Sequence, residues 1–408
     1  MTTQLVFFQK YVMIAHMPRK YEHTHPWITF SCDLRQVNHQ IWISLGEAHS
    51  KCEHIAGVLL TPAIAAEMHR LFLAKGIFAT TAIEGNTLTE KEVRSYLEGN
   101  LQLPASKQYL AQEMDNVETA LDLIFQETLN RSSVGLTVER IKEYNRIILD
   151  GLQLEDRVVA GEVRLRDVVV GGVYRGAPPE DCDYLLNRLC EWLNDPAFCP
   201  QNEGRVVYGL LRAILAHLYI AWIHAFGDGN GRTARLIEFE ILTSSGVPSP
   251  AAHLLSNHYN QTRPEYYRRL DEASKSGGNI WPFVSYAVNG FTEGLKEQIK
   301  LIKEQQLTVA WRDYVYNVFH NKNSKTDERQ RYLALDLSER VVAVPLAQIR
   351  DLSPRVAASY ATKTPKTLLR DLVELQKLDL VEKTPQGYRA KREIMLAFLP
   401  ECRLPEQV

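Results

Sequence analysis

An apolar segment at residues 206–223, VVYGLLRAILAHLYIAWI, limits the fold of this chain more than any other feature. A helix that is apolar on nearly every side must be buried, either in a bilayer or at the centre of a protein core. The segment approaches the length of a membrane span, but Arg212 and His217 interrupt it and a polar, glycine-rich loop follows directly. We therefore predict a central core helix. His217 lies two turns before His224, and we expect it to be a hydrogen-bonded core residue rather than a second catalytic group.

The loop after this helix carries an unusual set of polar groups. Residues 224–235 read HAFGDGNGRTAR, which combines a histidine, a carboxylate, an amide and two arginines with three glycines. Glycines let backbone N–H groups approach an anion closely, and the forks of Arg232 and Arg235 share one helical face. Asp228 is a hard oxygen ligand suited to Mg²⁺, and His224 titrates near neutral pH. The combination predicts a site that binds a polyphosphate and moves a proton beside it.

Three common glycine-rich motifs do not account for this loop. A Walker loop requires a lysine after the glycines, and none follows here. The dinucleotide fingerprint requires a third glycine where Arg232 stands. An EF-hand requires a glutamate at the position of Phe239. The plain alternative is a glycine-rich connection with a surface histidine, but few structural roles need these residue types together.

The segment resembles the signature of the Fic family, H-x-F-x-[DE]-G-N-G-R-x-x-R, and matches every specifying position from His224 to Arg235. One departure is Ala225, where family members usually carry proline; we expect it to loosen the turn slightly without removing a chemical group. The resemblance implies a mainly α-helical Fic fold and the transfer of AMP from ATP to a hydroxyl side chain of a target protein. A branch that phosphorylates its targets carries a lysine near the first arginine, and this chain does not.

The same resemblance implies a role for each polar residue of the loop. His224 is the expected catalytic base for the target hydroxyl, and Asp228 is expected to hold Mg²⁺ between the α- and β-phosphates of ATP. Arg235 is expected to bind the γ-phosphate, near a helix N-terminus whose dipole favours anions. The nucleotide-binding residues that we predict are Gly229, Asn230, Gly231, Arg232, Thr233, Arg235, Val170, Gly171, Gly172, Val173 and Tyr267.

A second motif lies upstream, at residues 80–86, TTAIEGN. Apolar residues at near-helical spacing precede it, so Glu84 is expected at a helix C-terminus, where its charge opposes the helix dipole. The local sequence by itself predicts that the Glu84 side chain is solvated at the end of this helix. The segment also resembles the Fic inhibitory motif [S/T]-x-x-x-E-[G/N], through Thr80, Glu84 and Gly85. That resemblance implies that Glu84 pairs with Arg235 and holds the enzyme off. We also expect that the same site is able to remove AMP from a target by hydrolysis, with Glu84 positioning the water.

Residues 166–174, RDVVVGGVY, are β-branched around a glycine pair, which predicts a β-hairpin. The plain alternative is a surface hairpin with a structural role only. In Fic proteins an equivalent flap covers the active site and pairs with an extended segment of the target, so residues 170–173 are expected nearest the nucleotide. Residues 265–270, EYYRRL, also resemble a family segment, in which Tyr267 is expected either to pack on the adenine or to be a buried tyrosine.

The whole chain is long enough for two or three units at 408 residues, and a formal net charge of −2 gives no general attraction to nucleic acid or acidic membranes. The N-terminus lacks a signal pattern and the six cysteines lack metal spacing, so we expect reduced thiols and a cytoplasmic protein. We predict an N-terminal segment at 1–60, an inhibitory helical part at 61–135, a Fic catalytic core at 136–305, a linker at 306–326 and a C-terminal domain at 327–408.

The C-terminal domain has the pattern of a winged helix-turn-helix. Residues 344–352 and 364–375 each suggest a helix, the second with Thr364 as its N-cap, and residues 380–389 suggest the wing. In such a fold, basic side chains on or near the second helix contact DNA phosphates. This segment has three of them, Lys363, Lys366 and Arg370, but three acidic residues reduce its positive charge, Asp371, Glu374 and Asp379. This balance favours protein docking or dimerisation over DNA binding.

The expected partners follow from these features. They are a protein substrate that presents a Ser, Thr or Tyr hydroxyl and a second copy of this chain, with no membrane. The alternative function is a DNA-binding regulator in which the Fic domain only senses nucleotide. Salt-dependent binding to duplex DNA without AMP transfer would distinguish that regulator.

Overall fold

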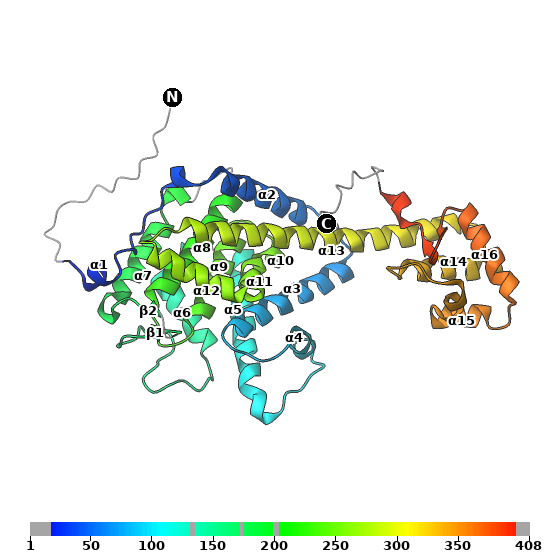
Figure 1. Ribbon diagram of the computed structural model, residues 1–408. Coiled ribbons are helices and arrows are strands. Elements are labelled where there is room, and N and C mark those ends of the chain that lie inside the picture. Colours follow the sequence, from blue (N-terminus) through cyan, green and yellow to red (C-terminus); the bar gives the residue numbers. More distant parts are fainter. Residues whose placement is uncertain (1–17, 131–134, 172–173, 199–203, 397–408) are drawn as a thin grey trace. The chain divides into compact units, whose positions relative to one another are not determined.

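The computed structural model describes residues 18–130, 135–171, 174–198 and 204–396 of the chain. Most of the described residues are helical, and two short hairpins supply their strands (Figure 1). The mainly α-helical class predicted from the sequence is therefore confirmed. The chain divides into two compact units, Met1–Gln298 and Ile299–Val408.

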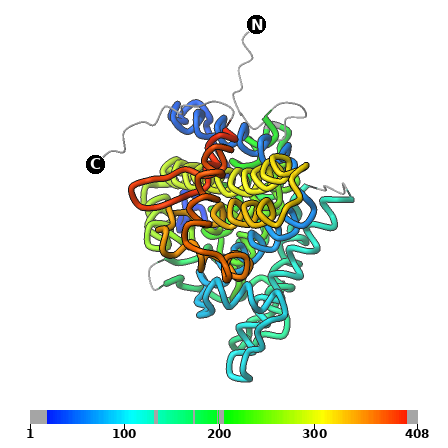
Figure 2. Tube along the Cα trace, turned by 90° about the vertical axis from the view of Figure 1, so that its right-hand side faces the viewer, coloured from blue at the N-terminus to red at the C-terminus, as the bar shows by residue number. Residues whose placement is uncertain are grey.

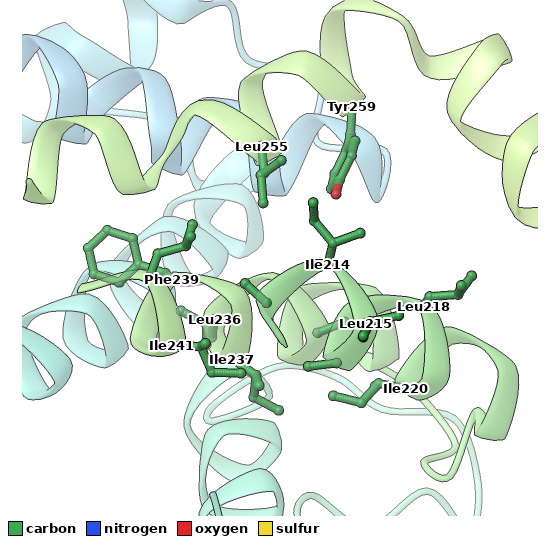
Figure 3. Packing of buried hydrophobic residues seen from close by; sticks show 14 of the residues in the cluster. Ile214, Leu215, Leu218, Ile220, Leu236, Ile237, Phe239, Ile241, Leu255 and Tyr259 are labelled. Atoms are coloured by element: carbon green, nitrogen blue, oxygen red, sulfur yellow. The ribbon is translucent and has the colours of Figure 1, made fainter. Parts of the chain in front are cut away.

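Helices α8 (Arg205–Ile223) and α9 (Asn230–Ser244) pack together in the core of the first unit. Ile214 of α8, Leu236 of α9 and Tyr259 of a neighbouring helix belong to one buried cluster (Figure 3). By length and composition α8 is able to cross a membrane, but 78% of its apolar window is buried inside the protein. The predicted core helix is confirmed, because the apolar sides of α8 are covered by protein.

His217 is fully buried in α8, and each of its ring nitrogens faces a polar group, although only Nε2 has the geometry of a hydrogen bond. Nδ1 lies 3.0 Å from Glu238 Oε2, and Nε2 lies 2.8 Å from the Tyr266 hydroxyl. The Tyr259 hydroxyl donates to the other Glu238 oxygen over 2.8 Å. This network confirms that His217 is a hydrogen-bonded core histidine.

Shorter and longer helices surround this pair. Those of the first unit are α1 (Lys20–Thr24), α2 (His39–Ala56), α3 (Pro62–Ile83), α4 (Glu90–Leu97), α5 (Gln108–Leu129), α6 (Val138–Ile148), α7 (Pro179–Leu193), α10 (Ser249–Ala252), α11 (Leu254–Gln261) and α12 (Arg263–Lys275), with the 3₁₀ helices η1 (Leu34–Gln36), η2 (Ala105–Lys107) and η3 (Pro196–Phe198). The segment around η2, coloured cyan, lies at the lower edge of this unit in both views (Figures 1 and 2).

Helix α3 carries the upstream motif. It begins with Pro62, whose missing N–H is not needed in a first turn, and it stops at Glu84. Gly85 follows with φ of +105°, an angle that glycine adopts without strain. The position of Glu84 at a helix C-terminus is therefore confirmed. Thr89 and Glu92 then form a capping box at the start of α4.

The predicted hairpin is present as β1 (Val169–Val170) and β2 (Tyr174–Arg175), which pair antiparallel with Val169 opposite Arg175. Its turn residues Gly172 and Val173, which we predicted to bind nucleotide, lie outside the described residues.

The N-terminal part of the described chain packs on this hairpin and on α7. The buried Asp181 of α7 accepts a 2.8 Å hydrogen bond from the Tyr21 N–H, and Arg19 Nη1 lies 3.3 Å from its other oxygen. His25 Nε2 lies 2.8 Å from the Arg175 carbonyl oxygen in β2. The segment therefore supports the hairpin from outside, a role that its sequence did not indicate.

The second unit contains the end of α13 (Trp281–Val318), then α14 (Lys325–Ser338), α15 (Pro354–Tyr360) and α16 (Pro365–Lys377), with η4 (Leu346–Asp351), β3 (Val381–Thr384), β4 (Gly387–Ala390) and η5 (Arg392–Met395). Strands β3 and β4 form a hairpin, and Val344 adds an isolated bridge to Tyr388. This order of elements agrees with the expected winged helix-turn-helix, whose assignment stays a prediction.

Two features of the second unit differ from the expectations. Residues 306–318, expected within a linker, are helical, because Trp311 and Val315 recur one turn apart and are buried in the core of this unit. Asp371 does not dilute the cations of α16. It is buried, and it accepts hydrogen bonds from Arg329 Nε over 2.7 Å and from the Tyr360 hydroxyl over 2.9 Å. Lys366 and Arg370 are exposed on the same helix.

Candidate active site

The glycine-rich loop connects α8 to α9 and is closed by one side chain. The Asn230 amide accepts the Phe226 N–H over 2.9 Å and donates to the Phe226 carbonyl over 2.8 Å. The assignment of Asn230 to the nucleotide stays a prediction, and its side-chain amide holds the loop closed. Gly229 begins α9 with φ of +76°, and a Cβ there would come within 3.0 Å of Asn145 Nδ2. Glycine is needed at this position for both its backbone angle and its lack of a side chain.

Asn145 of α6 holds the loop in place through hydrogen bonds of its side-chain amide. Its Nδ2 donates to the Asp228 carbonyl over 2.9 Å and lies 3.3 Å from Thr233 Oγ1, while its Oδ1 accepts the Gly161 N–H over 2.9 Å. Asn145 and Thr233 are both fully buried. The assignment of Thr233 to the nucleotide stays a prediction, and its side-chain hydroxyl faces Asn145 in the protein interior. Asn145 was not predicted at all.

Replacing Asn145 with alanine is expected to lower the free energy of unfolding of the first unit by about 3 kcal/mol, because each buried polar group left without a partner costs about 1–3 kcal/mol. Urea denaturation followed by circular dichroism measures the change. Asn187→Ala is the matched control, since that side chain is exposed on α7 and donates to the Asp183 carbonyl of its own helix. An equal effect of the two substitutions would contradict the role of Asn145.

His224 ends α8 in a left-handed conformation, with φ of 50° and ψ of 53°. Its Nδ1 lies 3.3 Å from the Ala221 carbonyl oxygen. A carbonyl only accepts, so Nδ1 carries the proton and Nε2 is left with its lone pair. Burial, aided by the positive charge of Arg164, lowers the pKa of His224 to about 4 against the opposing effects of the Ala221 carbonyl, Glu84 and Asp228. The imidazole is therefore neutral at pH 7, as a proton acceptor must be.

Arg235 of α9 is buried and bound by the upstream motif. Its Nε donates to Thr80 Oγ1 over 2.7 Å, and its Nη2 donates to the Thr80 carbonyl over 3.1 Å and to Glu84 Oε1 over 2.5 Å. Burial alone would raise the pKa of Glu84, but the charge and hydrogen bond of Arg235 outweigh it and the pKa lies below its ordinary value. The pairing of Glu84 with Arg235 that the motif implied is present.

Glu84 also lies against the loop. A Cβ at Gly231 would come within 2.2 Å of Glu84 Oε1, so only glycine leaves room for the carboxylate at this point. Glycine at 231 therefore permits the carboxylate to reach the N-terminal turn of α9 as well as Arg235.

Arg232 is buried and makes two long contacts. Its Nη1 lies 3.5 Å from Glu113 Oε1 and its Nη2 lies 3.4 Å from Asp228 Oδ1. Arg232 Nε and Arg235 Nη1 have no hydrogen-bond partner within the described parts of the chain. Buried guanidinium N–H groups of this kind retain capacity for an anion.

Asp228 is the predicted metal ligand, and its carboxylate is half exposed. Within the ranges that the structure describes, no group of three or more His, Cys, Asp and Glu side chains surrounds a common point. A single exposed carboxylate suits Mg²⁺, which keeps water and is held mainly by the phosphates of a nucleotide. It does not suit a cation that needs a full set of protein ligands.

A pocket of about 570 Å³ opens beside the loop. Predicted site residues that line it are His224, Glu84, Asn230, Gly231, Val170, Gly171 and Tyr267, and further lining comes from Ile83, Tyr174, Ala221, Trp222, Tyr266, Arg268, Leu270 and Asp271. Tyr267 is 45% exposed, so the buried-tyrosine alternative is wrong for it and instead describes Tyr266. Asp228, Gly229, Arg232, Thr233 and Arg235 do not line the pocket; Glu84, which does, is bonded to Arg235.

Comparisons with known proteins agree with this geometry. Residues 135–242 match the Fic/DOC family. Protein adenylyltransferase fic-1 of Caenorhabditis elegans is 30% identical over 227 residues, which are 56% of this chain and 41% of the relative. Protein adenylyltransferase Fic of Nematostella vectensis is 31% identical over 210 residues, 52% of this chain and 45% of the relative. The chain spans less than half the length of these curated relatives.

Solved structures show the same likeness. Fic-1 from C. elegans has a TM-score of 0.53 at 26% identity, covering 65% of this chain and 73% of that structure. A Fic domain containing signalling protein from Bacteroides thetaiotaomicron has a TM-score of 0.51 at 25% identity, covering 64% of this chain and 98% of that structure.

Proposed function

This chain carries a Fic/DOC domain at residues 135–242, and we propose on that premise that it transfers AMP from ATP to a Ser, Thr or Tyr hydroxyl of a protein. One observation carries the proposal. A neutral imidazole, His224, lines a pocket together with the glutamate that is bonded to the buried Arg235. Proton removal and charge neutralisation are the two needs of such a transfer.

The imidazole acts as the base. Nε2 of His224 takes the proton of the target hydroxyl, because Nδ1 is held as a donor to the Ala221 carbonyl. The hydroxyl oxygen forms a bond to the α-phosphorus. The bond from the α-phosphorus to the oxygen that joins it to the β-phosphorus breaks at the same time. Pyrophosphate leaves, and the proton on Nε2 passes to solvent.

The arginines and the α9 N-terminus neutralise the phosphates. Arg232 and Arg235 each retain a buried N–H for an anion, and the first N–H groups of α9 add the positive end of its dipole. Asp228 would hold Mg²⁺, which, when bound, neutralises the charge that develops on the phosphate oxygens. Tyr267 and Leu270 would line the wall beside the base of the nucleotide.

We further propose that the Glu84–Arg235 pair is an off state. Arg235 has its Nε on Thr80 and its Nη2 on Glu84, so a γ-phosphate must displace the carboxylate to reach the arginine fork. Relatives named adenylyltransferase support the activity, whereas the off state is supported by this contact and by the resemblance of residues 80–85 to the inhibitory motif.

The test is the intact mass of the protein after incubation with ATP and Mg²⁺. The expected result is a gain equal to one or more AMP groups in Glu84→Gly, little gain in the parent chain, and none in a chain with both Glu84→Gly and His224→Ala. A gain that survives loss of the imidazole would refute the proposed chemistry.

The titration of His224 gives a second check. Because its pKa is lowered from 6.5 to about 4, the imidazole is expected to stay neutral from pH 8 down to about pH 5 and to take its proton only as the pH falls through 4. Histidine-labelled protein followed by NMR measures this, with the signal assigned by its absence in His224→Asn. A midpoint at pH 6.5 or above would contradict the burial of this base.

A further inference from the structure

Arg164, in the segment between α6 and β1, is 7% exposed, and within the described residues its guanidinium donates to three backbone carbonyls. Its Nε donates to the His224 carbonyl over 2.7 Å, and its Nη1 donates to the Arg166 carbonyl over 2.5 Å. Its Nη2 donates to the Ala177 carbonyl. One planar group thus joins the end of α8 to both stalks of the hairpin, residues 165–168 and 176–178.

Backbone hydrogen bonds around Arg164 make the same connection. The Arg164 N–H donates to the Ala225 carbonyl over 3.0 Å, and the Ala177 N–H donates to the Ile223 carbonyl over 3.2 Å. Ile223, before His224, is therefore bonded to the stalk at 176–178, and Ala225, after it, is bonded to the backbone of Arg164 itself. Arg164 is the only side chain among these contacts, and it contacts all three segments.

Gly176 shows how closely the stalk approaches the imidazole residue. A Cβ added at Gly176 would lie 2.9 Å from Arg164 Nη2 and 3.0 Å from His224 Cβ. Real Cβ atoms essentially never come closer than 3.0 Å to other groups, so this position has no room for a side chain. The stalk, the guanidinium and His224 are thus in direct contact.

The conformation of His224 explains why such a clamp is useful. A left-handed backbone costs a non-glycine residue about 1–2 kcal/mol, and carbonyls at a helix C-terminus lack partners within the helix. The Arg164 cation satisfies the His224 carbonyl and also suits the negative end of the α8 dipole. The clamp therefore stabilises the backbone angle that aims the imidazole.

We propose that Arg164 is a positioning residue that holds the hairpin at a fixed distance from His224, so that a hydroxyl on a segment bound along the hairpin meets Nε2. The inference rests on the proposed AMP transfer. Arg164 itself does not contact the substrate. It acts on the reaction through the backbone of His224 and of the two stalks.

Two substitutions separate the shape of Arg164 from its charge. Arg164→Lys keeps the cation but loses the fork that reaches three carbonyls, whereas Arg164→Gln loses both. Arg166→Lys and Arg166→Gln are the matched controls, because that side chain is exposed two residues away. Gly176→Ala is a third variant that retains the Arg164 side chain but crowds its Nη2 and the His224 Cβ, so it strains the same contact from the stalk.

Hydrogen exchange tests the clamp without any catalysis. In Arg164→Lys, faster exchange is expected in residues 164–171 and 223–226, with α3 and α5 unchanged, while the Arg166 variants match the parent. Unchanged exchange in those two segments would overturn the proposal. Faster exchange throughout the first unit would also overturn it, because Arg164 would then be a general stability residue.

Transfer of label from α-labelled ATP onto the protein itself tests the consequence, in a Glu84→Gly background. Arg164→Lys and Gly176→Ala are each expected to lower the transfer rate about 100-fold, the cost of a displacement on the order of 1 Å, with ATP affinity within about threefold of the background. A rate equal to that of the Arg166 variants, or a loss explained by weaker ATP binding, would contradict the proposal. If the background itself transfers nothing, the proposed function fails while the exchange result still decides the clamp.

The titration of His224 supplies a third readout. The charged groups that act on its ring are Arg164, which lowers the pKa, and Glu84 and Asp228, which raise it. Arg164→Gln is therefore expected to raise the midpoint of His224 above about 4, whereas Arg164→Lys, which keeps the charge, leaves it nearer the parent value. A midpoint that is the same in the parent and in Arg164→Gln would contradict an electrostatic effect of the guanidinium on the imidazole.

Discussion

Glycine in place of Glu84 is expected to raise the rate of AMP transfer by about 10- to 100-fold. The Glu84 carboxylate holds Arg235 Nη2 over 2.5 Å, and Thr80 holds Nε. A hydrogen bond to a charged group contributes about 1.5–3 kcal/mol, and each 1.4 kcal/mol is a factor of ten in an equilibrium. Without the carboxylate, Arg235 Nη2 is free to bind the γ-phosphate. The equilibrium between unproductive and productive binding of ATP therefore shifts toward the productive pose by about the same factor.

The substitution itself is expected to leave the fold intact. Glu84 is the C-cap of α3, with φ of −86° and ψ of 0°, and it precedes Gly85. Glu98 is a matched control, because it is the C-cap of α4 with φ of −81° and ψ of −1° and precedes Gly99. Glu98→Gly removes a carboxylate from the same helical position but far from Arg235.

The initial rate of label transfer from α-labelled ATP, measured on parent, Glu84→Gly and Glu98→Gly, decides the matter. Only Glu84→Gly is expected to gain. Equal rates in all three chains would remove the off state and leave the base chemistry untouched, and equal gains in both variants would point to looser helix ends rather than to Arg235.

The parts of this molecule that the sequence predicted well are those set by local pattern. The core position of α8 follows from apolar residues on nearly every side of it, and the end of α3 at Glu84 follows from the glycine after it. Pairing of Glu84 with Arg235 was available only through the resemblance to a family motif, because the two residues are 151 positions apart in the chain.

The parts that were missed depend on side chains that bind backbone. Asn145 and Arg164 donate to carbonyls of segments distant in sequence, and no spacing or periodicity marks such a residue in one chain. The Thr233 side chain shows the same limit, because the one-residue step from Arg232 turns the helix by about 100°. That rotation carries its hydroxyl to Asn145 in the interior.

Part of the linker expected at 306–326 is helical for a different reason. Helix α13 continues to Val318 and contributes Trp311 to the core of the second unit, and the polar, turn-rich residues come only after it, at 321–327. A helix that passes from one unit to the next leaves no turn signal at the boundary, so composition marks the next loop instead.

Loss of the His224 imidazole is expected to lower AMP transfer by about 10²- to 10⁴-fold, the usual contribution of a positioned general base. Asparagine is the sharper replacement, because His224 has φ of 50° and asparagine adopts the left-handed region more readily than alanine. His224→Asn therefore keeps the backbone that Arg164 binds through the His224 carbonyl. It removes the lone pair of Nε2 and leaves Arg232 and Arg235 in place for the phosphates.

This division of roles predicts that ATP binding and AMP transfer separate. In a Glu84→Gly background, His224→Asn is expected to bind ATP within about threefold of the background by calorimetry while its transfer rate falls by the factor above. His54→Asn, on an exposed turn of α2, is the control and is expected to change neither quantity. A parallel loss of binding and transfer would mean that the imidazole holds the nucleotide rather than taking the proton, and an undiminished rate would exclude it as the base.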